Sequence, residues 1–131
     1  MVSSLGKQSV LLILLVLVVT ACAGVQQKPT VLGPGEKTLL IRVDSFKFEP
    51  NDIQARRGDV LSVKLENAAS VTHNLTIKTP QEATLVSVDI PAKSTISVTV
   101  NLAETGLYRF YCDKTFHSTM GMKGKIEVIA P

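Results

Sequence analysis

Apolar and polar residues alternate along most of the chain after Thr38. In the clearest stretch, residues 95–102, every second residue is apolar: Ile96, Val98, Val100 and Leu102. Successive side chains of a β-strand point to opposite faces, so this pattern predicts strands with one buried face and one face in water. No stretch has a convincing helical period, and the body of the chain is therefore expected to consist of strands.

Turn-forming residues separate the alternating stretches at short intervals. Gly, Pro, Asn and Asp gather at residues 49–52, 57–59 and 104–106, which predicts turns there. Similar alternation recurs at residues 39–43, 61–65, 75–78, 108–110 and 126–128. Seven or eight short strands at this spacing predict an all-β sandwich or a small barrel.

The first residues carry the features of a secretory signal. Lys7 supplies a positive charge, and residues 10–19 form an apolar run. That run is too short to span a membrane, which takes roughly 20 residues, but it suits the core of a signal peptide. It ends just before Ala21-Cys22, where the sequence resembles the lipobox of bacterial lipoproteins. We therefore expect residues 1–21 to be a lipoprotein-type signal peptide and Cys22 to be acylated.

Ordinary cleavage just after Ala21 or Ala23 is the alternative, and Cys22 would then have no special role. Residues 22–36 show no periodic pattern and are expected to form a flexible tether, which leaves residues 37–131 as the folded domain. A lipid on Cys22 would anchor the exported domain to a cell membrane, facing the periplasm or the cell exterior.

The charge balance gives no reason to expect a nucleic-acid partner. The chain has 14 Lys and Arg against 11 Asp and Glu, for a formal charge of +3, and removal of Lys7 lowers it by one. There is no long run of like charges that could follow a phosphate backbone. We expect a monomer.

The part of the chain after Cys22 has one Cys, Cys112, and two His, His73 and His117. His73 is in phase with the apolar residues of its strand, and Cys112 with those of another strand, so both point inward. If these strands are adjacent and antiparallel, the start of one meets the end of the other, and the imidazole and thiol converge. His117 and Met122 follow on the loop after Cys112.

Two imidazoles and a thiolate with a weak axial thioether are the donors of a blue-copper electron-transfer site. Thiolate and thioether are soft and favour Cu(I), while imidazole suits both oxidation states. Met120 is a second candidate for the axial position. A zinc site is chemically possible, but a thioether is a poor zinc ligand.

Each of these residues also has an ordinary structural explanation. A buried Cys is usually a small apolar core residue, and a His at a strand end is often hydrogen-bonded without binding a metal. A disulfide between Cys22 and Cys112 would be another way to explain the lone thiol.

The segment from residue 106 through Cys112 and His117 to residue 124 resembles the C-terminal signature of cupredoxins of the plastocyanin, amicyanin and auracyanin kind. Residues 46–50, 57–59 and 73–75 resemble upstream elements of that family, so that the resemblance spans about residues 38–128. It implies a Greek-key β-sandwich that holds one copper ion, used as Cu(II) and Cu(I). The family's equatorial ligands correspond to His73, Cys112 and His117, and its axial ligand to Met122.

Two further residues match the family. Asn74 corresponds to the Asn that ties the two ligand loops together near the thiolate, and Tyr108 to the family's tyrosine corner. Met122 is favoured over Met120 as axial ligand because it follows Gly121 in the family pattern. The binuclear copper centre of cytochrome oxidase subunit II needs a second Cys four positions after the first. The chain has Phe116 at that position, which excludes such a centre.

The resemblance implies a one-electron shuttle that is not an enzyme. Its partners would be redox proteins such as cytochromes or membrane oxidoreductases, which would dock weakly at an apolar surface around His117, with Phe116, Met120 and Pro50. A periplasmic copper carrier or chaperone with the same ligands is the alternative. A cysteine hydrolase using Cys112 is disfavoured, because the residue ends a strand that faces the core.

Overall fold

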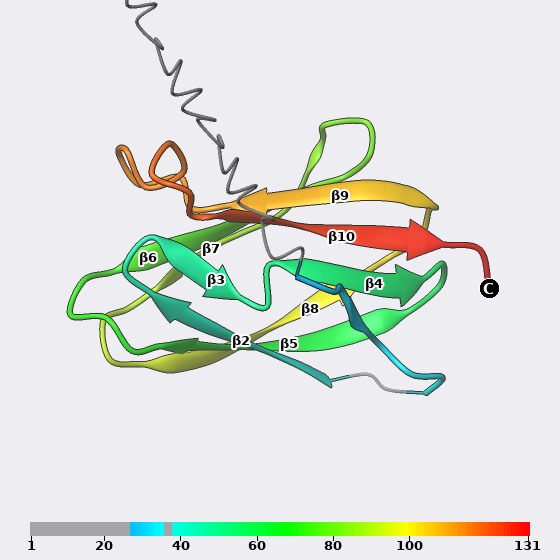
Figure 1. Ribbon diagram of the computed structural model, residues 1–131, viewed down its shortest axis with the longest axis horizontal. Coiled ribbons are helices and arrows are strands. Elements are labelled where there is room, and N and C mark those ends of the chain that lie inside the picture. The colour runs from blue at the N-terminus through cyan, green and yellow to red at the C-terminus, as the bar shows by residue number, and fades with distance from the viewer. Residues whose placement is uncertain (1–26, 36–37) are drawn as a thin grey trace, which may run out of the picture.

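The computed structural model describes residues 27–35 and 38–131, which contain ten β-strands and no helix (Figure 1). The strands are β1 (Thr30–Val31), β2 (Thr38–Asp44), β3 (Lys47–Glu49), β4 (Asp52–Arg56), β5 (Val60–Asn67), β6 (His73–Lys78), β7 (Thr84–Ile90), β8 (Thr95–Asn101), β9 (Gly106–Tyr111) and β10 (Lys123–Ile129). Among the described residues there is accordingly no helix that could cross a membrane.

The strands form two sheets that face each other across the core (Figure 1). One sheet has six strands in the order β1-β4-β10-β9-β6-β7, and the other has four in the order β3-β2-β5-β8. Strands that are distant in the sequence pair within both sheets, as β4 does with β10 and β2 with β5, so the chain crosses repeatedly between the layers. The expected Greek-key sandwich is confirmed, with two short strands, β1 and β3, beyond the seven or eight predicted.

The alternating pattern forms the core as expected. In β5, Leu61, Val63 and Leu65 are buried while the residues between them are exposed. β5 lies in the middle of its sheet, parallel to β2 and antiparallel to β8, so its apolar face is covered by the opposite sheet. Each such side chain contributes roughly 1.5–3 kcal/mol on burial, and this is what orients the strand.

β6 departs from the pattern, and the departure occurs next to the site. The alternation predicts that Thr76 faces water, but Thr76 is only 5% exposed and Asn74 only 3%. β6 lies between β9 and β7. The Thr76 hydroxyl donates to Asn74 Oδ1 over 2.7 Å and also lies 3.2 Å from the Ser87 hydroxyl on β7, so these buried polar groups are paired with one another.

The prediction of a flexible tether over residues 22–36 is wrong for residues 30–32. Thr30 pairs with Ile53 as β1 adds to the edge of β4, the Leu32 amide donates to the Gln54 carbonyl over 3.0 Å, and the Leu32 side chain is buried. A strand of two residues is too short to show a period in the sequence. The expected signal peptide, residues 1–21, and Cys22 lie outside the described residues.

Tyr108 forms the expected tyrosine corner. Its hydroxyl donates to the Glu104 carbonyl and accepts from the Glu104 amide, both over 3.2 Å. These bonds fasten the turn before β9 at the end of the sandwich where β10 finishes (Figure 1). β9 is thereby fixed at its start, and its other end carries Cys112.

Candidate metal centre

β6 and β9 bring the first two candidate ligands together. The strands are adjacent and antiparallel, with Thr76 opposite Tyr111, so the start of β6 meets the end of β9. His73 opens β6 and is 1% exposed, and Cys112 directly follows β9 and is fully buried. The predicted convergence of the imidazole and the thiol is confirmed.

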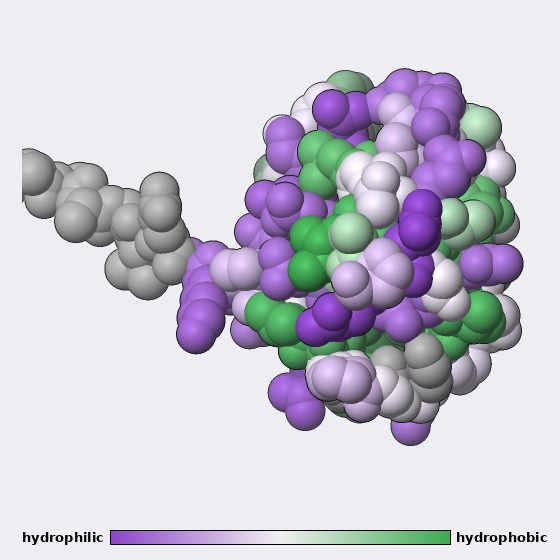
Figure 2. Space-filling model, turned by 90° about the vertical axis from the view of Figure 1, so that its right-hand side faces the viewer, coloured by the Kyte–Doolittle hydropathy of each residue, from purple (hydrophilic) through white to green (hydrophobic). Residues whose placement is uncertain are grey.

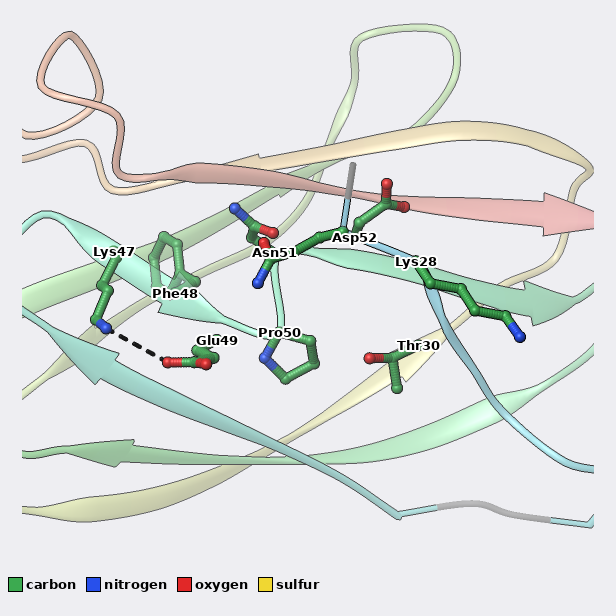
Figure 3. Close-up of a pocket in the computed structure, with 9 residues that line it drawn as sticks. Lys28, Thr30, Lys47, Phe48, Glu49, Pro50, Asn51 and Asp52 are labelled. Carbon is green, nitrogen blue, oxygen red and sulfur yellow. Dashed lines mark hydrogen bonds and ion pairs between the residues drawn. The ribbon is translucent and has the colours of Figure 1, made fainter. Parts of the chain in front are cut away.

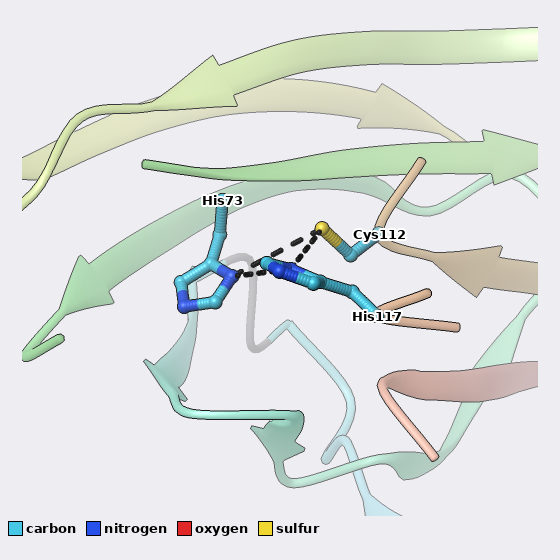
Figure 4. Close-up of side chains that lie close together, drawn as sticks. All are labelled: His73, Cys112 and His117. Carbon is cyan, nitrogen blue, oxygen red and sulfur yellow. Dashed lines mark hydrogen bonds between the residues drawn. The ribbon is translucent and has the colours of Figure 1, made fainter. Parts of the chain in front are cut away.

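His117 completes a cluster of three donors that point toward one another (Figure 4). The two Nδ1 atoms of His73 and His117 are 3.2 Å apart, and Cys112 Sγ lies 3.4 Å from His117 Nδ1 and 4.0 Å from His73 Nδ1. Metal bonds of about 2.0 Å to imidazole nitrogen and about 2.3 Å to thiolate sulfur would separate trigonal donors by about 3.5–3.7 Å. The cluster therefore has the size of a three-donor metal site.

The loop from Cys112 to Met122 is closed by its own backbone. The Cys112 amide donates to the Met122 carbonyl over 3.1 Å, and the Met122 amide donates to the His117 carbonyl over 3.0 Å. Three candidate ligands are thus linked by two main-chain hydrogen bonds. Their relative positions do not depend on a metal to hold them.

The two methionines of this loop have opposite environments. The Met122 side chain is fully buried and belongs to the core cluster, whereas Met120 is 60% exposed. Gly121, between them, has a φ of +101°, a conformation that favours glycine and lets the chain turn inward. The burial of Met122 beside Cys112 favours it over Met120 as the axial donor.

The Cys112 sulfur lies in a dry environment with one backbone donor. The Asn74 amide donates to Sγ over 3.3 Å, and such a bond stabilises negative charge on a thiolate. The Asn74 side chain does not reach the Cys112 loop itself. It donates from Nδ2 to Asp89 over 3.1 Å, and Asp89 in turn pairs with Lys114 on that loop. The expected tie between the ligand segments is therefore indirect.

The protonation state of His73 suits a metal ligand. Burial lowers the pKa of His73, the nearby His117 lowers it further, and Asp44 opposes these effects. The imidazole is therefore neutral near pH 7 and has a lone pair to offer. Its Nε2 is buried and has no hydrogen-bond partner among the described residues, while Nδ1 faces the other donors.

The outer side of the site is apolar. His117 is half-buried, and its ring packs against the Phe46 ring in a T-shaped arrangement with 5.3 Å between ring centroids. Phe46, Phe116 and Met120 are 38%, 73% and 60% exposed, and we call these three residues the apolar patch. Figure 2 shows the opposite end of the sandwich, where hydrophilic residues surround separate apolar ones.

Pro50, expected near His117, lines a separate hollow of about 420 Å³ between β1, β3 and β4 (Figure 3). Lys28, Thr30 and Lys47 line the same hollow, and Lys47 pairs there with Glu49 over 3.4 Å. None of the four candidate ligands is part of its lining. The hollow is therefore separate from the candidate metal site.

Residues 10–128 match the family model described as the Cupredoxin-like domain. The chain belongs to the cupredoxin family. Among curated relatives, this cupredoxin is similar to a plastocyanin from Daucus carota, with 31% identity over 87 residues that cover 62% of this chain and 86% of the relative.

Solved structures show the same fold. An auracyanin from Roseiflexus castenholzii, solved after reduction with dithionite, matches with a TM-score of 0.64 and 15% identity over 73% of this chain and 99% of its own. Auracyanin A from Chloroflexus aurantiacus matches with a TM-score of 0.62 and 18% identity over 72% and 100%. The metal-binding domain of the Cu(I)-exporting ATPase CopA from Streptococcus pneumoniae, solved with Cu(I), matches with a TM-score of 0.60 and 17% identity over 79% and 98%.

The donors of this cupredoxin fit copper. Two imidazoles, a buried thiol and a buried thioether provide the mixed soft and borderline ligands that copper prefers. His73, Cys112, His117 and Met122 are positioned as a copper site. Asp89 and Lys114 were not singled out in the sequence, because charged surface residues carry no local signal of a site, and Phe46 was named only within the segment 46–50 and not as a site residue.

Proposed function

We propose that this cupredoxin is a type 1, or blue, copper electron-transfer protein. The convergence of Cys112 Sγ with the Nδ1 atoms of His73 and His117 is the observation that carries the proposal, and the buried Met122 is bonded through its backbone to Cys112 and His117. Copper bound by these residues supplies one-electron exchange between Cu(II) and Cu(I). The protein contributes the fixed positions of the donors.

The fold holds the donors in place independently of the metal's charge. His73 and Cys112 are fixed by the register of β6 and β9, and His117 and Met122 by the main-chain bonds of their loop. A trigonal set of mixed donors suits neither oxidation state fully, so little movement is needed when the charge changes. This supports rapid electron exchange over substrate chemistry, and so does the complete burial of Cys112, which a nucleophilic thiol would not have.

His117 provides the route between the metal and the surface. It is the half-buried ligand, and the apolar patch lies beside it. A small apolar contact area suits partners that bind weakly and release quickly, as electron-transfer pairs do. Redox proteins such as cytochromes or membrane oxidoreductases are the partners that we propose.

We propose the cellular location of the protein together with its function. The signal-like residues 1–21 and the Cys22 motif support export and a lipid anchor that faces the periplasm or the cell exterior. Mass spectrometry of the protein from its membrane fraction tests the anchor. An acylated Cys22 at the new N-terminus is expected, and an unmodified N-terminus after residue 21 or 23 would contradict it.

A copper titration tests the function. Cu(II) added to purified residues 23–131 is expected to give an intense visible band from thiolate-to-copper charge transfer, saturating at one equivalent, and Cys112→Ser is expected to abolish it. Absence of the band in the unaltered protein would overturn the proposal. Reversible voltammetry of the loaded protein supports a shuttle, whereas rapid loss of copper to a chelator supports the carrier alternative.

A further inference from the structure

Asp89, on β7, bonds two residues that belong to different ligand segments. Its Oδ1 accepts from Asn74 Nδ2 over 3.1 Å, and its two carboxylate oxygens lie 2.9 and 3.0 Å from Lys114 Nζ. Asn74 directly follows the ligand His73, and Lys114 lies between Cys112 and His117. A single carboxylate therefore links the strand that carries one ligand to the loop that carries the others.

The loop has few other polar ties to the sandwich. Among the described residues 113–121, Lys114 is the one side chain besides the ligand His117 that makes a hydrogen bond or ion pair outside the segment. Thr119 donates to the Phe116 carbonyl, within the loop itself. Release of Lys114 would leave residues 113–116 held by the loop's own backbone bonds.

The same carboxylate fixes the orientation of Asn74. The Asn74 amide oxygen accepts from Thr76 over 2.7 Å, and its amide nitrogen donates to Asp89, so both ends of the side chain are bonded. The main-chain N–H of this residue donates to Cys112 Sγ over 3.3 Å. Hydrogen bonding at the Cys sulfur tunes the potential of a blue-copper site.

We propose that Asp89 and Lys114 are positioning residues, whose ion pair holds the Cys112–His117 loop against β6 and keeps the Asn74 N–H on the Cys112 sulfur. The effect on potential rests on the proposed copper function, whereas the link itself is a property of the metal-free protein. The electrostatics agree with the link. The hydrogen bond from Lys114, and then that from Asn74, lower the pKa of Asp89, and the same ion pair raises the pKa of Lys114.

A positioning role of the ion pair and a purely electrostatic role predict shifts of the reduction potential with different signs in the variants. A carboxylate near the metal favours the oxidised state and an ammonium favours the reduced state, so loss of charge alone would raise the potential in an Asp89 variant and lower it in a Lys114 variant. Loss of the ion pair weakens the hydrogen bond from the Asn74 N–H to Cys112 Sγ in both variants, and the thiolate then stabilises Cu(II) more. Positioning therefore predicts that both variants lower the potential.

The experiment compares Asp89→Ala, Lys114→Met and the double variant, with Asp89→Asn as a milder change of the same residue. Glu82→Ala is the matched control, because Glu82 is an equally exposed carboxylate that pairs with Arg109 on β9, away from the loop. In the metal-free proteins, hydrogen exchange of the Asn74 amide and of residues 113–121 is expected to be faster on the order of fivefold in each single variant, and no faster in the double variant. Glu82→Ala is expected to exchange as the unaltered protein does.

The loaded proteins supply the second measurement. Equal downward shifts of the reduction potential in both single variants, without a further shift in the double variant, support the proposal. Unchanged exchange, or opposite shifts that add in the double variant, would overturn it. If even the unaltered protein forms no blue copper site, the proposed function fails, and the exchange measurements still decide whether the link exists.

Discussion

The rings of Phe46 and His117 pack in a T-shaped arrangement, with 5.3 Å between the centroids and 84° between the planes. Phe46 lies in the turn between β2 and β3, and its φ of 59° is in the left-handed region that a bulky residue rarely adopts. The chain accepts this backbone strain and places an aromatic ring against the half-buried ligand. Phe116, directly before His117, also has a positive φ, of 64°.

Phe46→Ala is expected to slow electron exchange without changing the metal site. The variant loses part of the apolar patch that two molecules would bring together, while the three equatorial donors stay in place. We expect the visible spectrum to be retained and the electron self-exchange rate to fall severalfold, measured by NMR line broadening in mixtures of oxidised and reduced protein.

Ile129→Ala is the matched control for Phe46→Ala. Ile129 is 37% exposed, close to the 38% of Phe46, but it ends β10 at the opposite end of the sandwich. We expect its self-exchange rate to equal that of the unaltered protein. A similar fall in both variants would contradict a specific contact surface around His117.

The two methionines of the ligand loop are expected to respond differently to the same substitution. Met122→Leu keeps an apolar side chain of similar size in the core, at a stability cost below about 1.5 kcal/mol, but removes the thioether. Loss of this weak donor destabilises Cu(II) more than Cu(I), so the reduction potential should rise and the visible spectrum should change.

Met120→Leu is the control for this substitution, because Met120 is 60% exposed and Met122 is fully buried. The control is expected to leave both the potential and the spectrum as they are. A larger response in Met120→Leu than in Met122→Leu would assign the axial position to Met120.

Strand phase, together with one assumed strand pairing, predicted where the first two ligands meet. His73 and Cys112 share the inward phase of their strands, and one pairing, β6 with β9, then places them together. The phase of a strand is set by its own sequence, so burial of the apolar face determines the position of these two side chains. The burial of the core-facing residues of β2 and β5 could be predicted for the same reason.

Other parts of the site depend on tertiary neighbours and could not be predicted. Thr76 is polar and out of phase with the core, yet it is buried on the outer face of β6, a strand flanked on both sides. The partners Asp89 and Lys114 are 25 residues apart and each resembles an ordinary surface charge. β1 is only two residues long and gains its pairing from the edge of β4.

The stability that Asp89 contributes is expected to disappear in acid. Its pKa is lowered below the ordinary value of 3.8, first by the hydrogen bond from Lys114 and then by that from Asn74. A lowered folded-state pKa means that the contribution is complete above pH 3.8 and is lost as the pH falls through the folded-state pKa. In urea unfolding of the metal-free protein, the difference between the unaltered chain and Asp89→Asn should therefore shrink as the pH is lowered from 5 to about 2.5.

Glu82→Gln is the control, because Glu82 is an equally exposed carboxylate that pairs with Arg109 on β9. Its difference from the unaltered protein at each pH is the background with which Asp89→Asn is compared. A difference for Asp89→Asn that stays constant down to the lowest pH would show that the carboxylate charge contributes nothing to stability.

Gly124 is expected to tolerate no side chain, although its backbone is not strained. It lies opposite Phe110 in the pairing of β10 with β9. A Cβ there would come within 2.3 Å of the Phe110 ring and 2.5 Å of the Asn51 carbonyl oxygen. The ring is only 1% exposed and the carbonyl accepts from the Lys125 amide, so neither can move aside freely.

Gly124→Ala should lower the free energy of unfolding by about 1–3 kcal/mol through overpacking, measured by urea denaturation of the metal-free protein. Gly121→Ala is the informative comparison, because a Cβ at Gly121 would meet nothing within 4 Å but the residue has a φ of +101°. Its cost is backbone strain of about 1–2 kcal/mol, and the strain falls on the turn that carries Met122 inward. Gly121→Ala should therefore disturb the visible spectrum of the loaded protein, while Gly124→Ala should lower stability with the spectrum intact, since Gly124 lies beyond the ligand loop.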